Sequence, residues 1–212
     1  MNNFKLLDPR PRAKEAPFTF YLPSEKILKQ LKVEDSVKLL FEVPLEVTDG
    51  PDAERMWVTI TERKRKRFKG LLQNQPGYIA GLNRGDLISF ETFHILDTSL
   101  TDPKAREMDY YFDTKCLVSN RILEENKKPR FMLCDEADSS RPAFWSFYGG
   151  GESEEYCAVP ENFRRVSIGV ILNMDPRIEK LIRTPPPAVF EIGKSGKWIS
   201  ADDFDWNEYR TS

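Results

Sequence analysis

The sequence contains little histidine and little cysteine. Its single histidine is His94, and its three cysteines, Cys116, Cys134 and Cys157, lie 18 and 23 residues apart. Three cysteines cannot all pair within one chain, and their spacing forms no CxxC motif. Because a structural zinc site takes about four closely spaced nitrogen and sulfur ligands, this set predicts reduced thiols and no metal site.

Catalytic and cofactor-binding motifs are also missing. A general base needs partners within hydrogen-bond reach, and no residue pattern around His94 supplies them. The glycines at 149–151 follow a predicted strand, but glutamates come next, where a phosphate-binding loop has lysine and a hydroxyl residue. We therefore predict a protein that is not an enzyme and has no cofactor. The alternative is an unrecognised hydrolase, which would need a pocket with perturbed carboxylates.

Long apolar runs are absent as well. No segment approaches the roughly 20 apolar residues of a membrane helix, and the first 18 residues lack the apolar region of a signal peptide. The net charge of −2 over 212 residues does not favour wholesale binding to a polyanion. These features predict a cytoplasmic protein that does not bind a membrane, and they do not favour binding to nucleic acid. They specify no oligomeric state.

The charge is distributed unevenly along the chain. Residues 1–98 hold 16 Lys or Arg and 14 Asp or Glu, a net +2, whereas residues 99–212 hold 16 and 20, a net −4. This asymmetry favours two small α+β domains, each a curved, mainly antiparallel sheet with a few short helices. The expected boundaries are an N-terminal arm and short helix at 1–34, a β-rich domain at 35–98, a connecting helix or linker at 99–113, an α+β domain at 114–200 and an acidic tail at 201–212.

Apolar and β-branched runs between turn residues predict the strands of the first domain. Prolines at positions 9, 11, 17 and 23 favour an extended arm that precedes the strands. Ser24 is expected to cap a helix over 25–31. Glycines mark the corners of a strongly curved sheet. Its predicted strands are 36–43, 55–62, 67–74 and 87–96.

The same signals predict the elements of the second domain, which follows a helix over 103–111. Short helices are expected at 121–124 and 176–183. The acidic tail should fray unless Phe204 and Trp206 tie it down. The predicted strands are 116–119, 130–134, 143–148 and 166–172, followed by a hairpin of 189–192 and 197–199.

The stretch from Arg141 to Phe163 has the most distinctive chemistry, because four aromatic residues precede three glycines and three glutamates. The aromatic residues are either core or anchors for a partner, since Tyr and Trp often dominate binding energy. The glutamates are either a solvated loop or an electrostatic contact for a basic protein, and they match only part of a calcium-binding pattern. The candidate partner-binding residues are Trp145, Tyr148, Glu152, Glu154, Glu155 and Tyr156.

A basic run forms the densest charge cluster and falls at a predicted hairpin turn. Such a turn is solvated whatever its function, and charges at a sheet edge discourage aggregation. The alternative is a regulatory module that contacts nucleic acid or another anion there, although no aromatic residues interleave to stack on bases. The candidate anion-contact residues are Arg63, Lys64, Arg65, Lys66, Arg67 and Lys69.

Residues 114–200 contain four motifs in succession. They are a Cys-Leu-Val-Ser strand at 116–119, Trp-Ser-Phe-Tyr-Gly at 145–149 with acidic residues and Tyr156, Pro-Glu-Asn-Phe at 160–163, and Asp-Pro at 175–176. This succession resembles an immunity-protein domain family of bacterial polymorphic toxin systems. The extra glycines after Tyr148 depart from the family pattern. The resemblance implies a non-catalytic protein that binds and neutralises a toxin or other protein partner.

A second resemblance covers residues 35–98. Its motifs are Glu-Arg-Met-Trp-Val at 54–58, Gly-x-Leu-x-Asn-x-Pro at 70–76 and Gly-Asp-x-Ile-x-Phe at 85–90. This part is similar to the YegJ-like domain of unknown function. That family implies a fold and brings no established chemistry.

Overall fold

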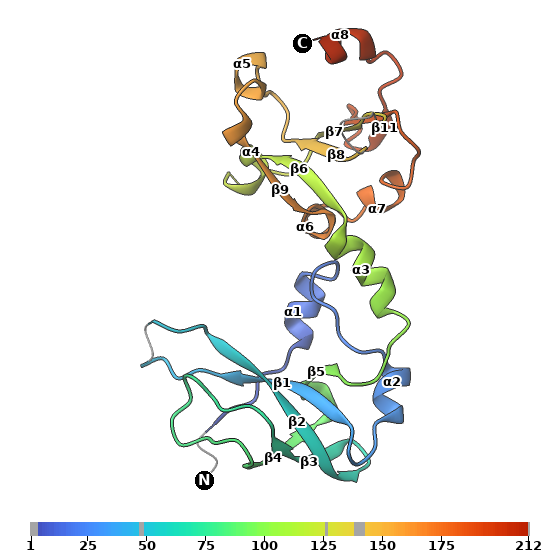
Figure 1. The fold of residues 1–212 in the computed structure, drawn as a ribbon. Coiled ribbons are helices and arrows are strands. Elements are labelled where there is room, and N and C mark those ends of the chain that lie inside the picture. Colours follow the sequence, from blue (N-terminus) through green and yellow to red (C-terminus); the bar gives the residue numbers. More distant parts are fainter. Residues whose placement is uncertain (1–3, 47–48, 126, 138–142, 212) are drawn as a thin grey trace. The chain divides into compact units, whose positions relative to one another are not determined.

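The computed structural model describes residues 4–46, 49–125, 127–137 and 143–211. The chain forms two compact units, Met1–Asp109 and Tyr110–Ser212 (Figure 1). Each unit has its own mainly antiparallel sheet and short helices, so the predicted α+β class with two small domains is confirmed. Within the described residues, no helix is both long enough and apolar enough to cross a membrane.

The first unit is built on a five-stranded antiparallel sheet with the order β4-β3-β2-β1-β5. β4 and β5 are consecutive in the chain but lie at opposite edges, and a 3₁₀ turn leads from one to the other. The strands are β1 (Ser36–Glu42), β2 (Ala53–Lys64), β3 (Arg67–Leu72), β4 (Leu87–Glu91) and β5 (Ile95–Thr98). The helices are α1 (Arg10–Glu15), α2 (Glu25–Gln30) and the 3₁₀ turn η1 (Thr92–His94). Helix α3 (Ala105–Asp113) begins in this unit and ends in the second.

Strict alternation of buried and outward side chains produces the core of this unit. Val37, Leu39 and Phe41 of β1 are fully buried, and the alternate residues of β2 join them in one apolar cluster. Gly70 of β3 lies opposite Ile60 beside a register shift, where the Thr59 backbone leaves no room for a Cβ atom. Such irregularities increase the local twist of a sheet.

Two predicted elements of the first unit are wrong. The arm contains helix α1, because Pro9 precedes it and Pro11 lies in its first turn, where a helix does not need the missing N–H. The strand predicted over 87–96 is broken by η1, since the backbone N–H of Glu91 donates to His94 Nδ1 at 3.0 Å. His94 therefore lies in a turn rather than in mid-strand.

Asp102 joins three segments of the first unit. Its carboxylate is 7% exposed and accepts hydrogen bonds from the Tyr21 hydroxyl, from the Ser24 N–H at 2.7 Å and from the Lys104 N–H at 3.1 Å. Burial raises the pKa of Asp102, but these hydrogen bonds outweigh it and lower the pKa to about 2. The ionised carboxylate thus holds the arm and the start of α2 against the segment before α3.

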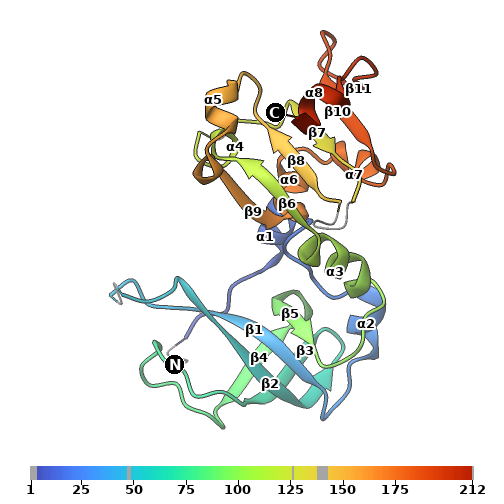
Figure 2. The same ribbon diagram turned by 45° about the horizontal axis from the view of Figure 1, so that its top comes forward.

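The second unit is built on a six-stranded sheet with the order β11-β10-β7-β8-β6-β9. β6 lies between β8 and β9 (Figure 2) and pairs parallel with β8, whereas the other pairs are antiparallel. The strands are β6 (Lys115–Ser119), β7 (Phe131–Cys134), β8 (Trp145–Tyr148), β9 (Phe163–Ser167), β10 (Ala188–Ile192) and β11 (Trp198–Ser200). The helices are α4 (Asn120–Leu123), α5 (Glu154–Cys157), η2 (Pro160–Asn162), α6 (Ile168–Met174), α7 (Ile178–Leu181) and α8 (Trp206–Thr211).

The strand predicted over 166–172 is wrong. β9 ends at Ser167 and the apolar residues that follow form α6, in which Ile168, Ile171 and Leu172 are fully buried. Their spacing of three and four residues is that of a helix face, and a short apolar run does not distinguish a buried strand from a buried helix. The tail forms α8 and is tied down by Phe204, whose ring lies 6.0 Å from that of Phe131.

Asp175 joins the segment after α6 to the edge strand β11 of the second sheet. Its carboxylate is 4% exposed, pairs with the Arg177 guanidinium through both oxygens, and accepts from Trp198 Nε1 at 2.9 Å. Burial raises the pKa of this carboxyl, and its donors lower the pKa below the ordinary value. The helix predicted to start at Asp175-Pro176 begins instead at Ile178 with Arg177 as its N-cap, and Asp175 follows α6 and contacts β11.

Replacing Gly70 by alanine should destabilise the first unit. The new methyl carbon would lie 2.4 Å from the Thr59 carbonyl oxygen and 2.6 Å from a Val58 methyl carbon. Overpacking of a filled core typically lowers the free energy of unfolding by about 1–3 kcal/mol. Urea denaturation can compare Gly70→Ala with Lys69→Ala, an exposed neighbour expected within about 0.5 kcal/mol of wild type. Equal losses in both variants would contradict the steric argument.

The first unit should also lose stability in acid through Asp102. Its carboxylate stays ionised in the folded unit until the pH approaches about 2, whereas in the unfolded chain it gains a proton near its ordinary pKa of 3.8. The stabilisation is therefore complete above the unfolded pKa and is lost as the pH falls through the folded value. Urea midpoints of wild type and Asp102→Asn should differ most at neutral pH and converge in acid. A constant gap would count against this linkage.

Candidate functional site

An acidic cleft of about 1330 Å³ opens on the second unit. Its walls come from the ends of β7 and β8, from α5, from β10 and from the segment that carries α8. Among the described residues that line this acidic cleft, eight have carboxylates and a ninth, Arg210, is basic. Charges this dense and of one sign create a strong local field that attracts cations.

The register of the sheet explains the floor of the acidic cleft. Tyr148 of β8 lies opposite Phe131 of β7, which lies opposite Glu191 of β10, so these three side chains form one row on one face. The rings of Phe131 and Tyr148 meet edge to face at 5.7 Å. Burial raises the pKa of Tyr148, and its hydroxyl therefore stays neutral. The floor combines apolar ring surface with a neutral hydroxyl that can donate a hydrogen bond.

The opposite face of the same strands belongs to the core. Trp145 and Phe147 alternate with Tyr148 and point away from the acidic cleft. Trp145 is 6% exposed, and its Nε1 donates to the carbonyl of Ile182 at 3.2 Å. Of the two interpretations left open by the sequence, core packing holds for Trp145 in this structure, whereas Tyr148 borders the acidic cleft.

Helix α5 brings two glutamates to the rim. Ser153 caps the helix, its hydroxyl accepting from the Tyr156 N–H at 3.2 Å, and Glu154 and Glu155 follow in the first turn. Carboxylates at a helix start are favoured by the helix dipole. Backbone and Ser153 hydrogen bonds lower the pKa of Glu155. Both side chains are exposed, so the rim presents two solvated negative charges.

The other two residues expected at the partner-binding surface are engaged within the loop. The Glu152 carboxylate accepts from the Gly149 N–H at 2.8 Å and closes the glycine turn. The Tyr156 hydroxyl lies 3.2 Å from the carbonyl of Asn162 and 3.3 Å from the Ser119 hydroxyl. The structure thus brings Tyr148, Glu154 and Glu155 together at the acidic cleft.

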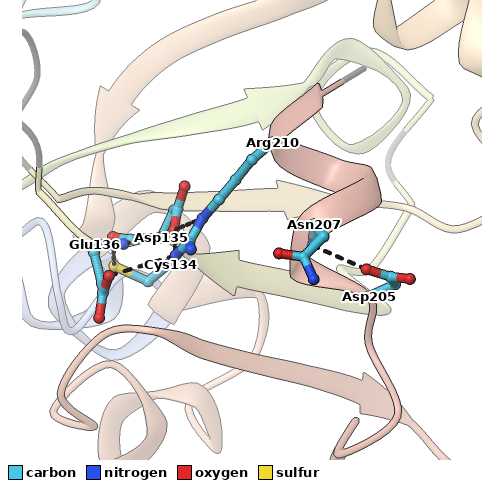
Figure 3. A network of polar contacts seen from close by, with 6 residues as sticks. All are labelled: Cys134, Asp135, Glu136, Asp205, Asn207 and Arg210. Atoms are coloured by element: carbon cyan, nitrogen blue, oxygen red, sulfur yellow. Dashed lines mark hydrogen bonds and ion pairs between the residues drawn. The ribbon is translucent and has the colours of Figure 1, made fainter.

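Several lining residues were not expected from the sequence. Arg210 of α8 reaches Asp135 and Glu136, which follow β7 (Figure 3). Its Nη2 lies 2.7 Å from Asp135 Oδ1 and 3.5 Å from Glu136 Oε2. Asp205 caps α8 by accepting from the N–H groups of Asn207 and Glu208. The acidic composition of 201–212 was a signal, but only the folded sheet brings it against residues 135 and 136.

Half of the basic hairpin is engaged by other parts of the first unit. The Arg63 guanidinium donates to the carbonyls of Leu31 and Lys29, which end α2. Lys69 pairs with Glu62 at 3.0 Å and Arg67 with Glu91 at 3.6 Å. The remaining three cations, Lys64, Arg65 and Lys66, are exposed at the turn.

Metal and thiol chemistry finds little support in the part of the chain that is described. No group of three or more His, Cys, Asp or Glu residues there could hold a metal ion. Burial raises the pKa of Cys116 to about 12 and that of Cys134 to about 11, so both thiols stay protonated. Cys157 is exposed beside the acidic cleft.

Comparison with protein families gives two matches. Residues 116–202 match the immunity protein Imm33 domain, and residues 13–125 match a family of uncharacterized proteins conserved in bacteria, DUF2314. Both resemblances seen in the sequence are confirmed. No curated protein and no solved structure matches the chain. The first match indicates a role in immunity to a toxin. Because the second match spans more than half of its residues, the chain belongs to the DUF2314 family of proteins conserved in bacteria, and its second half matches the Imm33 immunity protein domain.

Proposed function

We propose that this protein is a non-catalytic immunity protein that binds a bacterial toxin through the acidic cleft and neutralises it. One observation carries the proposal: five carboxylates and an aromatic floor of the segment that matches Imm33 line one cleft, and three carboxylates of the residues that follow it complete the cleft. Tyr148, Glu154 and Glu155 contribute to that surface from the matched segment. The N-terminal unit has no assigned part in this function.

Electrostatics favours a basic partner. Eight carboxylates around one open cavity repel one another, and a positively charged protein surface relieves that repulsion on binding. Complementary charge mainly speeds association and selects the partner, while the aromatic floor supplies apolar contact area. A toxin that attacks nucleic acid needs a basic surface for its own substrate. Covering that surface would block the toxin without any chemical step.

This mechanism has consequences for where the protein acts. A toxin delivered by a neighbouring cell, as in polymorphic toxin systems, has to be met in the compartment where its substrate lies. We therefore infer a cytoplasmic site of action. Neutralisation by occlusion requires one immunity protein per toxin molecule and a complex that outlasts the toxin's encounter with its substrate.

The alternative, anion binding at the basic hairpin, has less support. Arg63, Arg67 and Lys69 already have partners in the first unit, so three exposed cations remain at the turn. Anion binding there would weaken steeply with salt. Lys64→Glu with Lys66→Glu should leave toxin neutralisation unchanged if the acidic cleft is the binding surface.

Charge reversal at α5 should slow binding of the toxin and weaken protection. Glu154→Lys with Glu155→Lys changes the net charge from −2 to +2, and the matched control Glu15→Lys with Glu161→Lys makes the same change at exposed positions that do not line the acidic cleft. We expect the first variant to associate with the toxin about tenfold or more slowly at low salt, with a weaker salt dependence. The control should resemble wild type.

The measurement begins with capture of partners from the native host on the tagged full chain. A captured protein qualifies as the toxin only if it arrests growth when expressed alone and the wild-type chain restores growth. Association rates are then followed by surface plasmon resonance at several salt concentrations. An association rate and a salt dependence of the α5 variant equal to those of wild type, or an equal loss in both variants, would refute the acidic cleft as the binding surface.

A further inference from the structure

We propose that the acidic cleft takes an extended segment of its partner. Cationic side chains of this segment meet Glu154, Glu191 and Asp203. The Tyr148 hydroxyl donates a hydrogen bond to one of its backbone carbonyls. The inference rests on the proposed function, because it names the part of the toxin that the same cleft recognises, and it gives Tyr148 the role of distinguishing a peptide backbone from other polycations.

Three carboxylates of the acidic cleft are open to a partner. Glu154 on α5, Glu191 on β10 and Asp203 after β11 are exposed and line the cleft. None of the three forms an ion pair with another residue in the part of the chain that the structure describes. They belong to three different elements, so each can attract a separate cation of the partner.

This arrangement suits a chain of charges better than a compact ion. Within the described residues, no three His, Cys, Asp or Glu side chains lie close enough together to hold a metal ion. The cavity of about 1330 Å³ also exceeds the roughly 300–1,000 Å³ of an ordinary small-molecule pocket. Carboxylates that are spread around a large cavity complement a partner whose cations are spaced along a chain.

The floor of the acidic cleft adds a directional donor. Cys157 and Tyr209, which line the same cleft, are electrostatic neighbours of the Tyr148 hydroxyl. Burial raises the pKa of Tyr148 and keeps it neutral, and a side-chain hydrogen bond from Ser146 opposes that rise. Ser146 therefore donates to the phenolic oxygen, and the phenolic proton is left for another acceptor.

An extended backbone supplies that acceptor. Carbonyl groups inside a helix are bonded within their own chain, whereas those of an extended segment are free to accept from a partner. Successive side chains of an extended segment point to opposite sides, so its cations can reach different walls while a carbonyl points to the floor. The ring of Phe131 beside Tyr148 offers apolar surface to the aliphatic stems of those cations.

The test compares two polycations on the full chain at low salt. One is a dodecapeptide of alternating lysine and glycine with blocked ends, and the other is spermidine, which has cations but no hydrogen-bond acceptor. By titration calorimetry, Tyr148→Phe should bind the peptide about fivefold more weakly than wild type does, because one neutral hydrogen bond is lost. Its affinity for spermidine should be unchanged. Tyr78→Phe, at an exposed tyrosine of the first unit, is the matched control and should bind both like wild type.

Cys157 reports whether the peptide lies in the acidic cleft. Its side chain is exposed and lines the cleft, whereas Cys116 and Cys134 are buried. The bound peptide should therefore slow alkylation of Cys157 by iodoacetamide about threefold or more, measured by mass spectrometry of tryptic fragments.

Several outcomes would overturn the proposal. Equal peptide affinities of wild type and Tyr148→Phe would remove the hydrogen bond to the backbone. Equal losses for the peptide and for spermidine would show a general effect of the substitution on the cleft. Unchanged alkylation of Cys157 with the peptide bound would place the peptide elsewhere, and binding of spermidine without binding of the peptide would make the cleft a site for small polycations.

Failure of this inference is separable from failure of the proposed function. If charge reversal at α5 slows association with the toxin but Tyr148→Phe leaves the peptide affinity unchanged, only the extended segment is refuted. If the α5 reversal has no effect, the acidic cleft itself is refuted as the toxin-binding surface.

Discussion

A carboxylate taken out of water has to find donors, and three buried aspartates fix how distant segments of this chain meet. Asp102 holds Tyr21 and the start of α2, Asp175 holds Trp198 of β11, and Asp135 holds Arg210 of α8. In each case the donor and the acceptor are far apart in the sequence. Removing either partner leaves a polar group without compensation, so these contacts specify the arrangement of segments more than they add net stability.

The three contacts differ in their surroundings. The Asp135 carboxylate accepts from the Glu136 N–H as well as from Arg210, which extends from a short helix beside an open cavity. Asp135 lines the acidic cleft, whereas Asp102 and Asp175 are not among its lining residues.

Much of the fold could be predicted from the sequence, because strands with one buried face alternate clearly. β1, β2 and β3 lie close to their predicted ranges. The strand predicted over 166–172 was wrong, because a short apolar run suits a strand and a buried helix equally. The extended arm was also wrong, because Pro9 and Pro11 stand at the start of a helix. Three of the six residues predicted to bind a partner, Tyr148, Glu154 and Glu155, line the acidic cleft, and local chemistry was enough to single them out. Asp135 and Arg210 could not, because 75 residues separate them and only the strand order of the sheet brings them together.

The two sheets also differ in how their strands are connected. In the first, β1 to β4 pair in the order in which they leave the ribosome, and β5 completes the sheet before residue 100. In the second, β6 pairs with β8 and β9, and β7 pairs with β8 and β10, so the sheet is complete only late in the chain. Each sheet contains a distant pairing, β1 with β5 in the first and β7 with β10 in the second, and such pairings slow folding. Because every strand of the first sheet precedes residue 100, the first unit can fold during synthesis, while the acidic cleft forms only after translation has passed β10 and α8.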